Sequence, residues 1–155
     1  MESGEVMELA ELAKKYCNLV ESLASSNVLD ELTNIASSLS ELYSKVLKLP
    51  QVESDSTDIP EVTVSRPKLS FDKYECYWEI FEPYKLEEAT CSSLSDDILD
   101  IYQDIKKGLL QYEGNEKGEA IWHWHFHFYT HWVNHVVDAL HALHSIIQNH
   151  QFDVD

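Results

Sequence analysis

The chain has 155 residues, with 28 acidic against 11 basic side chains and a formal net charge of −17. Hydrophobic residues make up 44% of it and aromatic residues 11%, as in a folded protein with a substantial core. The excess of carboxylates disfavours nucleic acid and anionic membranes as partners, because both are bound by exposed lysine and arginine. The same acidity suits either simple solubility or a basic protein partner.

The N-terminal residues have no basic start and no unbroken apolar run, so we expect no signal peptide. No stretch reaches the roughly 20 apolar residues that a membrane span requires. Cys17, Cys76 and Cys91 are widely spaced and form no CxxC pattern, which argues against a disulfide framework or a zinc knuckle. These features predict a cytoplasmic protein with reduced thiols, and the apolar stripe around Cys17 predicts that this thiol is buried and unreactive.

Two amphipathic helices are expected in the N-terminal third of the chain. The first covers residues 5–24, where apolar side chains recur at the i, i+3, i+4 and i+7 positions of one helix face. The second follows a break at residues 25–27, with Asn27 or Asp30 available as N-cap, and ends before Pro50. The short break between them predicts an antiparallel helical hairpin.

The next part of the chain is less regular. Residues 48–70 contain three prolines and predict a surface connection, with a short extended piece at 62–64. The aromatic segment 71–84 fits two periods. One helix face would carry Phe71, Tyr74, Trp78 and Phe81, whereas a strand would place Tyr74, Cys76, Trp78 and Ile80 on one side. We favour a short helix and leave the strand open.

Two further helices follow. One begins after Ser95, a good N-cap, and stops at Gly114. The last, rich in histidine and tryptophan, runs from about Glu116 to Asn149. Its expected apolar arc consists of Trp122, Phe126, Tyr129, Val133, Val136, Val137, Leu140, Leu143 and Ile147, widened by Phe128, Trp132, Ala139 and Ile146. The chain is therefore predicted to be a single all-α domain over residues 1–155, a helical bundle of four main helices plus a short fifth element around 74–81. The long C-terminal helix is expected at its centre.

A narrow polar face of the last helix carries the candidate metal ligands. His127, His131 and His135 follow one another at i, i+4 steps, and Asp138 lies three residues beyond His135. Two imidazoles one turn apart can hold Zn²⁺, Ni²⁺ or Co²⁺, and a carboxylate can complete a set of three protein ligands. The alternative is that these histidines are hydrogen-bonded or solvent-facing side chains with no metal.

The preceding helix carries acidic residues that could join them. Asp97, Asp100 and Asp104 share one helix face, and they would meet the histidines if the two helices pack antiparallel. We also expect the crowded imidazoles to have depressed pKa values, since like charges one turn apart repel. Stability should then fall below about pH 6 as the unfolded chain takes up more protons.

No catalytic motif is visible. The sequence has no HExxH, no glycine-rich phosphate loop and no G-x-S-x-G. We therefore expect a non-enzymatic protein without a cofactor that binds another macromolecule, such as a regulatory or toxin-neutralising partner. The alternative is a metal-binding protein that uses a divalent transition metal, with a metal-dependent hydrolase as its catalytic form.

Two stretches, LSDDILDIYQDIKKGL at 94–109 and HWVNHVVDALHALHSI at 131–146, carry a family resemblance, supported by LYSKVLKLP and YWEIFEP. The chain resembles a family of small, mainly bacterial, helical proteins known only as a domain of unknown function. The resemblance implies an all-helical domain and supplies no catalytic or binding residues. It also implies that other residues can stand at the positions of His131 and His135, which argues against a metal site shared by the whole family.

Overall fold

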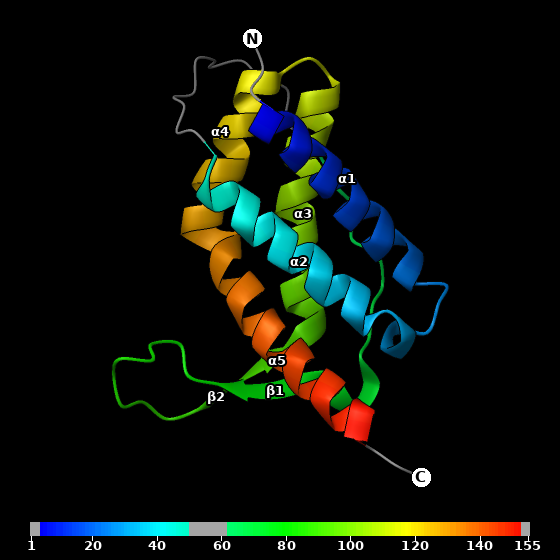
Figure 1. Cartoon of the computed structure of the whole chain (residues 1–155), viewed down its shortest axis with the longest axis vertical. Coiled ribbons are helices and arrows are strands. Elements are labelled where there is room, and N and C mark those ends of the chain that lie inside the picture. The colour runs from blue at the N-terminus through cyan, green and yellow to red at the C-terminus, as the bar shows by residue number, and fades with distance from the viewer. Residues whose placement is uncertain (1–3, 50–61, 153–155) are drawn as a thin grey trace.

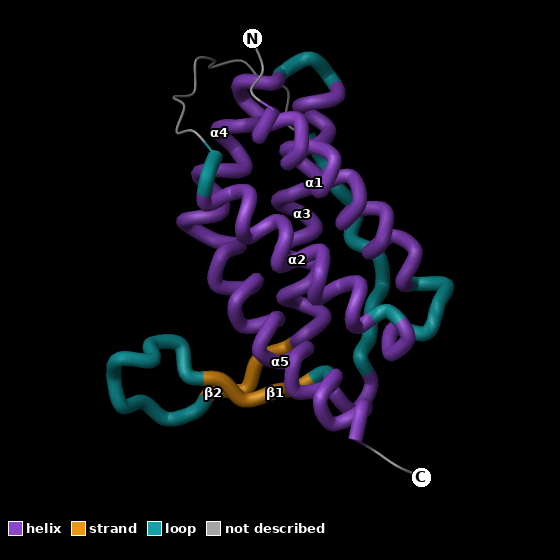
Figure 2. Tube along the Cα trace, viewed as in Figure 1, coloured by secondary structure: helices purple, strands orange, loops and turns teal. Residues whose placement is uncertain are grey.

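The computed structural model describes residues 4–49 and 62–152, and Figure 1 shows the helical bundle that they form. In chain order the elements are α1 (Gly4–Leu23), the 3₁₀ turn η1 (Val28–Asp30), α2 (Leu32–Leu47), the 3₁₀ turn η2 (Asp72–Tyr74), β1 (Cys76–Glu79), β2 (Thr90–Ser93), α3 (Leu94–Glu113), α4 (Lys117–His127), the π-helical turn η3 (Phe128–Trp132) and α5 (Val133–Phe152). Because α4, η3 and α5 follow one another without a break, the bundle has the four main helices predicted (Figure 2).

The helices pack around one hydrophobic core. α1 lies against α2 and α3, α4 lies against α3, and α5 lies against both α2 and α3. α3 therefore shares the central place that was predicted for the C-terminal helix alone. Among residues 4–49 and 62–152, no helix combines the length and the apolar composition that a membrane span requires.

The first loop differs in detail from the prediction. The Asn27 side chain accepts a hydrogen bond from the Leu29 amide and caps the turn η1, not α2. α2 begins only at Leu32, after that turn has closed. Further along, residues 50–61 of the predicted connection lie outside the described residues, and residues 62–70 contain no helix or strand. The expected extended piece at 62–64 thus does not pair as a strand.

The segment predicted as a short helix is a strand. β1 pairs antiparallel with β2, with Cys76 opposite Ser93 and Glu79 opposite Thr90. Side chains alternate along β1: Tyr77 and Glu79 are half-buried, whereas Cys76 and Trp78 are exposed. The strand, which the sequence analysis left open, is therefore correct and the short helix is wrong. The sequence of this segment fits both periods, and pairing with β2 selects the strand.

The cysteine prediction is also partly wrong. Cys76 and Cys91 form a disulfide between β1 and β2, with 6.1 Å between their Cα atoms. The spacing of 15 residues gave no hint of it, because hairpin pairing brings the two side chains together. Cys17 is buried as predicted, and burial raises the pKa of its thiol to about 12.

The hairpin is fixed to the start of α3 through Glu75. This carboxylate accepts hydrogen bonds from the Ser95 amide at 3.0 Å, from the Ser93 hydroxyl at 2.7 Å and from the Phe71 amide at 2.8 Å. The N-cap of α3 is Ser93, whose hydroxyl accepts from the Asp96 amide, and not the predicted Ser95. β2 therefore leads directly into α3, and the position of the hairpin is set by the helix that carries the acidic face.

The π-helical turn decides which face of the C-terminal helix is buried. Ala120, Trp124, Phe128, Trp132 and Val136 are buried at consecutive four-residue steps. On an ideal α-helix each such step turns about 40° too far, so the row would drift by roughly 160° around the axis. A wider π turn absorbs part of this drift, because it holds more residues per turn, and so keeps the large aromatic side chains in the core.

The apolar arc expected for this helix was therefore wrong at three positions, whereas the residues that widened it are buried: Phe128, Trp132, Ala139 and Ile146. Phe126, Tyr129 and Val137 are exposed, although each was placed in the buried arc. The alternating WHWHFHF pattern offers apolar side chains in several directions, so periodicity alone did not identify the buried stripe. The same four-residue spacing carries His123, His127, His131 and His135, so the π turn also sets where these imidazoles point.

Candidate metal centre

α3 and α5 run antiparallel, and their contact brings the acidic face of one against the histidines of the other. His131 donates from Nδ1 to Asp104 Oδ2 at 2.6 Å. One turn later, His135 donates from Nδ1 to Asp97 Oδ1 at 2.7 Å. The expectation that carboxylates of the preceding helix meet the histidines is confirmed. Both imidazoles are oriented by these bonds, and each keeps Nε2 as its second ring nitrogen for another ligand.

A third residue completes a compact group with these two histidines. His135 Nε2 lies 3.2 Å from Asp100 Oδ2. One ligand atom from each of Asp100, His131 and His135 lies within 4.8 Å of the others. Ligand atoms around a tetrahedral zinc ion are roughly 3.4 Å apart, so small side-chain rotations would close the group on an ion. The arrangement supplies two nitrogens and one oxygen.

Arg66 holds Asp100 from the other side. Its guanidinium forms an ion pair with Asp100 Oδ1, and its Nε donates to Gln103 Oε1 at 3.0 Å. Since Arg66 occupies one carboxylate oxygen, Oδ2 is the oxygen that faces His135. The sequence did not predict this contact, because Arg66 belongs to the irregular connection and reaches α3 only through the tertiary fold.

Side chains of the hairpin contact the acidic residues around the site. The Tyr77 hydroxyl bonds to Asp97 Oδ2 and lies 3.4 Å from Glu79 Oε2, and Ser92 bonds to Glu79 Oε1. Burial raises the pKa of Tyr77 well above its ordinary value, and the bond to Asp97 adds to that effect. Tyr77 and Glu79 were not candidates at the sequence level, because the strand that carries them was expected to be a helix.

Asp138, a predicted ligand, lies outside the group of three. Its carboxylate interacts with that of Glu79. Burial, the bond to Glu79 and the charge of Glu79 together raise the pKa of Asp138 to about 7. Asp138 therefore contributes to the acidic surroundings of the centre, not to its nearest ligands.

His127, the other predicted ligand that lies apart, packs against His123 with the rings tilted by 40° and 4.2 Å between their centroids. Burial lowers the pKa of His127, and it lowers the pKa of His123 to about 4. The expected depression of histidine pKa values thus holds for these two, with burial as the larger cause. It is wrong for His135, whose pKa is raised because Asp97 accepts its hydrogen bond.

The three-residue group opens into a cleft of about 600 Å³ between the hairpin and the contact of α3 with α5. Ser92, Thr130 and Asn134 line this cleft beside the carboxylates and imidazoles. His131 is exposed and His135 is half-buried, so one side of the group faces solvent. An ion bound here would keep positions open for water or for a small ligand.

Comparison with known families identifies the family to which the chain belongs. A family model described as Domain of unknown function (DUF5063) matches residues 1–149. The chain belongs to this family. The resemblance to a domain of unknown function noted in the sequence is confirmed, and a comparison with curated proteins found no match.

A solved structure has a similar fold. The crystal structure of protein BF1032 from Bacteroides fragilis is similar to this chain, with a TM-score of 0.76 and 20% sequence identity. The similarity covers 99% of this chain and 96% of BF1032. At this identity the likeness supports the fold alone, so a function is inferred from the side chains of this chain.

Proposed function

We propose that this protein binds a divalent transition-metal ion through Asp100, His131 and His135. The observation that carries the proposal is the pair of carboxylate–imidazole contacts at 2.6 and 2.7 Å, which hold both rings by Nδ1 beside a third ligand. In metal sites the ligating histidine usually donates its other ring N–H to a carboxylate or carbonyl, which fixes the tautomer and raises ligand basicity. Asp104 and Asp97 are placed to do this for His131 and His135.

The donor set favours zinc and its neighbours. Imidazole nitrogen suits Zn²⁺, Ni²⁺, Co²⁺ and Fe²⁺, and one carboxylate oxygen is a common third ligand. Structural zinc sites usually have four protein ligands, whereas three with an open position are typical of sites that bind water or substrate. Hydrolysis by metal-bound water is the reaction class that this arrangement would support, with the adjoining cleft as the substrate space.

Metal content of the untagged protein, purified without chelators, tests the proposal. We expect near-stoichiometric zinc, nickel, cobalt or iron by inductively coupled plasma mass spectrometry, and loss of that metal in the double variant His131→Ala/His135→Ala. His144→Ala is the matched control, because His144 is exposed on the same helix and outside the group. The proposal would be wrong if the double variant and the control had equal metal content. It would also be wrong if the wild-type protein were free of metal and bound no added zinc by calorimetry.

Two sequence-level predictions stay open beside it. The role as a non-enzymatic binder of a macromolecule is independent of the metal centre, and so is the cytoplasmic location. A disulfide such as Cys76–Cys91 is rarely stable in a reducing cytosol. Thiol titration of protein trapped by alkylation in intact cells would test both the location and the bond.

A further inference from the structure

The hairpin projects from the bundle (Figure 1), and it carries several exposed apolar side chains. Trp78 is 71% exposed and Tyr84 is 95% exposed, and Leu86 is fully exposed. Ile80 and Phe81, also exposed, lie between them in the chain. Single exposed apolar residues are ordinary on a protein surface, but five of them within one short segment favour an interaction site.

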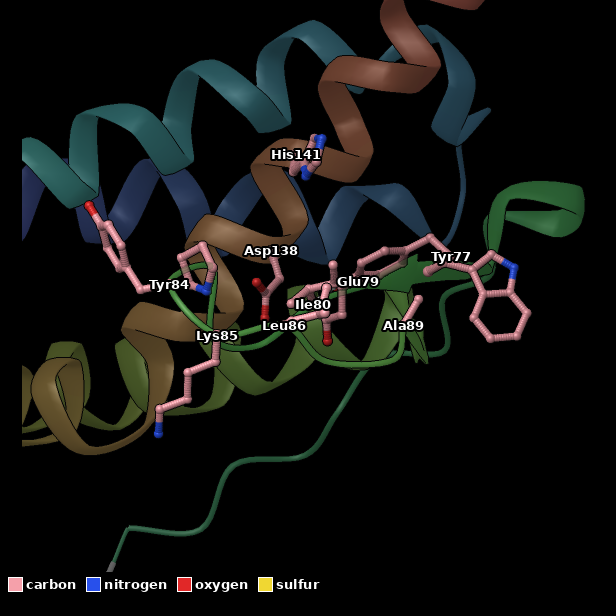
Figure 3. Close-up of a pocket in the computed structure, with 11 residues that line it drawn as sticks. Tyr77, Glu79, Ile80, Tyr84, Lys85, Leu86, Ala89, Asp138 and His141 are labelled. Carbon is pink, nitrogen blue, oxygen red and sulfur yellow. Dashed lines mark hydrogen bonds between the residues drawn. The ribbon is translucent and has the colours of Figure 1, made fainter.

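The same segment encloses a pocket against α5. Its volume is about 680 Å³, within the range of known ligand-binding pockets. Ile80, Tyr84 and Leu86 of the connecting loop line this pocket together with Asp138 and His141 of α5 (Figure 3). The pocket is therefore built from apolar loop side chains over a polar helix face.

The charge of this surface is negative. Glu79 and Asp138, which are hydrogen-bonded to each other, both line the pocket. Glu82, Glu87 and Glu88 are further carboxylates in the segment that joins β1 to β2. Lys85 also lines the pocket, but its ammonium group points away from Asp138 (Figure 3). A cationic group placed near Glu79 and Asp138 would be attracted by both carboxylates.

We propose that the hairpin and α5 form a docking surface for a basic, apolar peptide segment of a partner protein. An aliphatic or aromatic side chain of that segment would pack among Trp78, Tyr84 and Leu86, and a lysine or arginine next to it would reach Glu79 and Asp138. Charge complementarity selects this occupant, because a net charge of −17 repels acidic peptides, nucleic acids and anionic lipid. The proposed metal ligands Asp100, His131 and His135 do not line this pocket, although Glu79 and Asp138 line both it and the cleft beside those ligands.

A displayed library of random twelve-residue peptides is the probe. Peptides selected on the full-length wild-type protein are synthesised with a fluorescent label, and their affinities are measured by anisotropy at 0.15 M salt. Two protein variants test the two parts of the surface. Glu79→Gln/Asp138→Asn neutralises the two carboxylates that line the pocket. Tyr84→Ser/Leu86→Ser removes apolar groups that are exposed and therefore dispensable for folding. Glu5→Gln/Glu11→Gln on α1 is the control with the same change in net charge.

We expect the enriched peptides to carry lysine or arginine beside an apolar residue. We also expect their dissociation constants to rise at least tenfold in each test variant and to change less than twofold in the control. Enrichment of peptides without a basic residue, no enrichment, or equal weakening in the control would overturn the proposal. A concentration-dependent dimer in sedimentation velocity that Tyr84→Ser/Leu86→Ser abolishes would assign the surface to a second copy of the chain and would also overturn it.

Discussion

Asp97 and His135 join α3 to α5 through a hydrogen bond of 2.7 Å, which the imidazole Nδ1 donates to the Asp97 carboxylate. The Asp97 side chain is only 7% exposed. The same carboxylate accepts from the Tyr77 hydroxyl of β1. Asp97 thus ties together three elements that are distant in sequence, and it orients the ring whose Nε2 faces Asp100. Its role in the proposed metal centre is to position His135.

Replacing Asp97 by asparagine should weaken metal binding without removing a ligand. An amide accepts a hydrogen bond less strongly than a carboxylate, and loss of such an outer partner typically lowers metal affinity about 10–100-fold. We expect that rise in the zinc dissociation constant by isothermal titration calorimetry. Asp96→Asn, which makes the same charge change at an exposed neighbouring position, should leave the affinity within about threefold of wild type. Equal affinity in both variants would contradict the positioning role.

Gly108→Ala should destabilise the protein although alanine is the better helix former. A Cβ atom at Gly108 would overlap the indole ring of Trp124, which is fully buried and donates to the Ile105 carbonyl at 3.1 Å. Overpacking of this kind costs about 1–3 kcal/mol, more than the roughly 1 kcal/mol gained in helix propensity. Urea denaturation would measure the loss.

Gly118→Ala is the matched control for that substitution. Gly118 lies in the first turn of α4, and a Cβ atom there would meet nothing within 4 Å. We expect it to be neutral or to stabilise by up to about 1 kcal/mol. A stabilising effect of Gly108→Ala equal to that of Gly118→Ala would show that Trp124 does not pack as described.

Acidification should destabilise the fold through His123. Burial lowers the pKa of His123 in the folded chain to about 4, whereas an unfolded histidine titrates near 6.5. Between these values the unfolded chain binds the additional proton, so the free energy of unfolding falls as pH drops from about 6.5 to 4, by up to about 3 kcal/mol. His123→Gln should flatten this part of the pH profile measured by denaturation, whereas His144→Gln should retain it.

Asp138→Asn should stabilise the protein, and more so at high pH. Because the pKa of Asp138 is raised to about 7 in the folded state, the native chain resists losing this proton. The resulting destabilisation is absent below about pH 4, grows as pH rises, and is complete above about pH 7. The increase in thermal midpoint over wild type should therefore be larger at pH 8 than at pH 5. An equal shift at both values, or the same trend in Glu11→Gln, would argue against a raised pKa of Asp138 in the folded chain.

Local patterns were sufficient for much of the bundle. The apolar stripes of α1 and α2 and the stop at Gly114 follow from helix periodicity and backbone preference, which depend only on nearby residues. The i, i+4 spacing of His131 and His135 likewise put their imidazoles on one helix face before any partner was known. The family resemblance agreed with this outline.

Contacts between distant residues decided the rest. The aromatic segment became β1 only by pairing with β2, and that pairing brought Cys76 to Cys91. The π turn changes which face of the last helix is buried, and it keeps the large rings of Trp124, Phe128 and Trp132 in one core. Antiparallel packing of α3 on α5 brings Asp100, and not His127 or Asp138, next to His131 and His135. Which ligands converge depends on the relative position of two helices, and a sequence pattern does not contain that information.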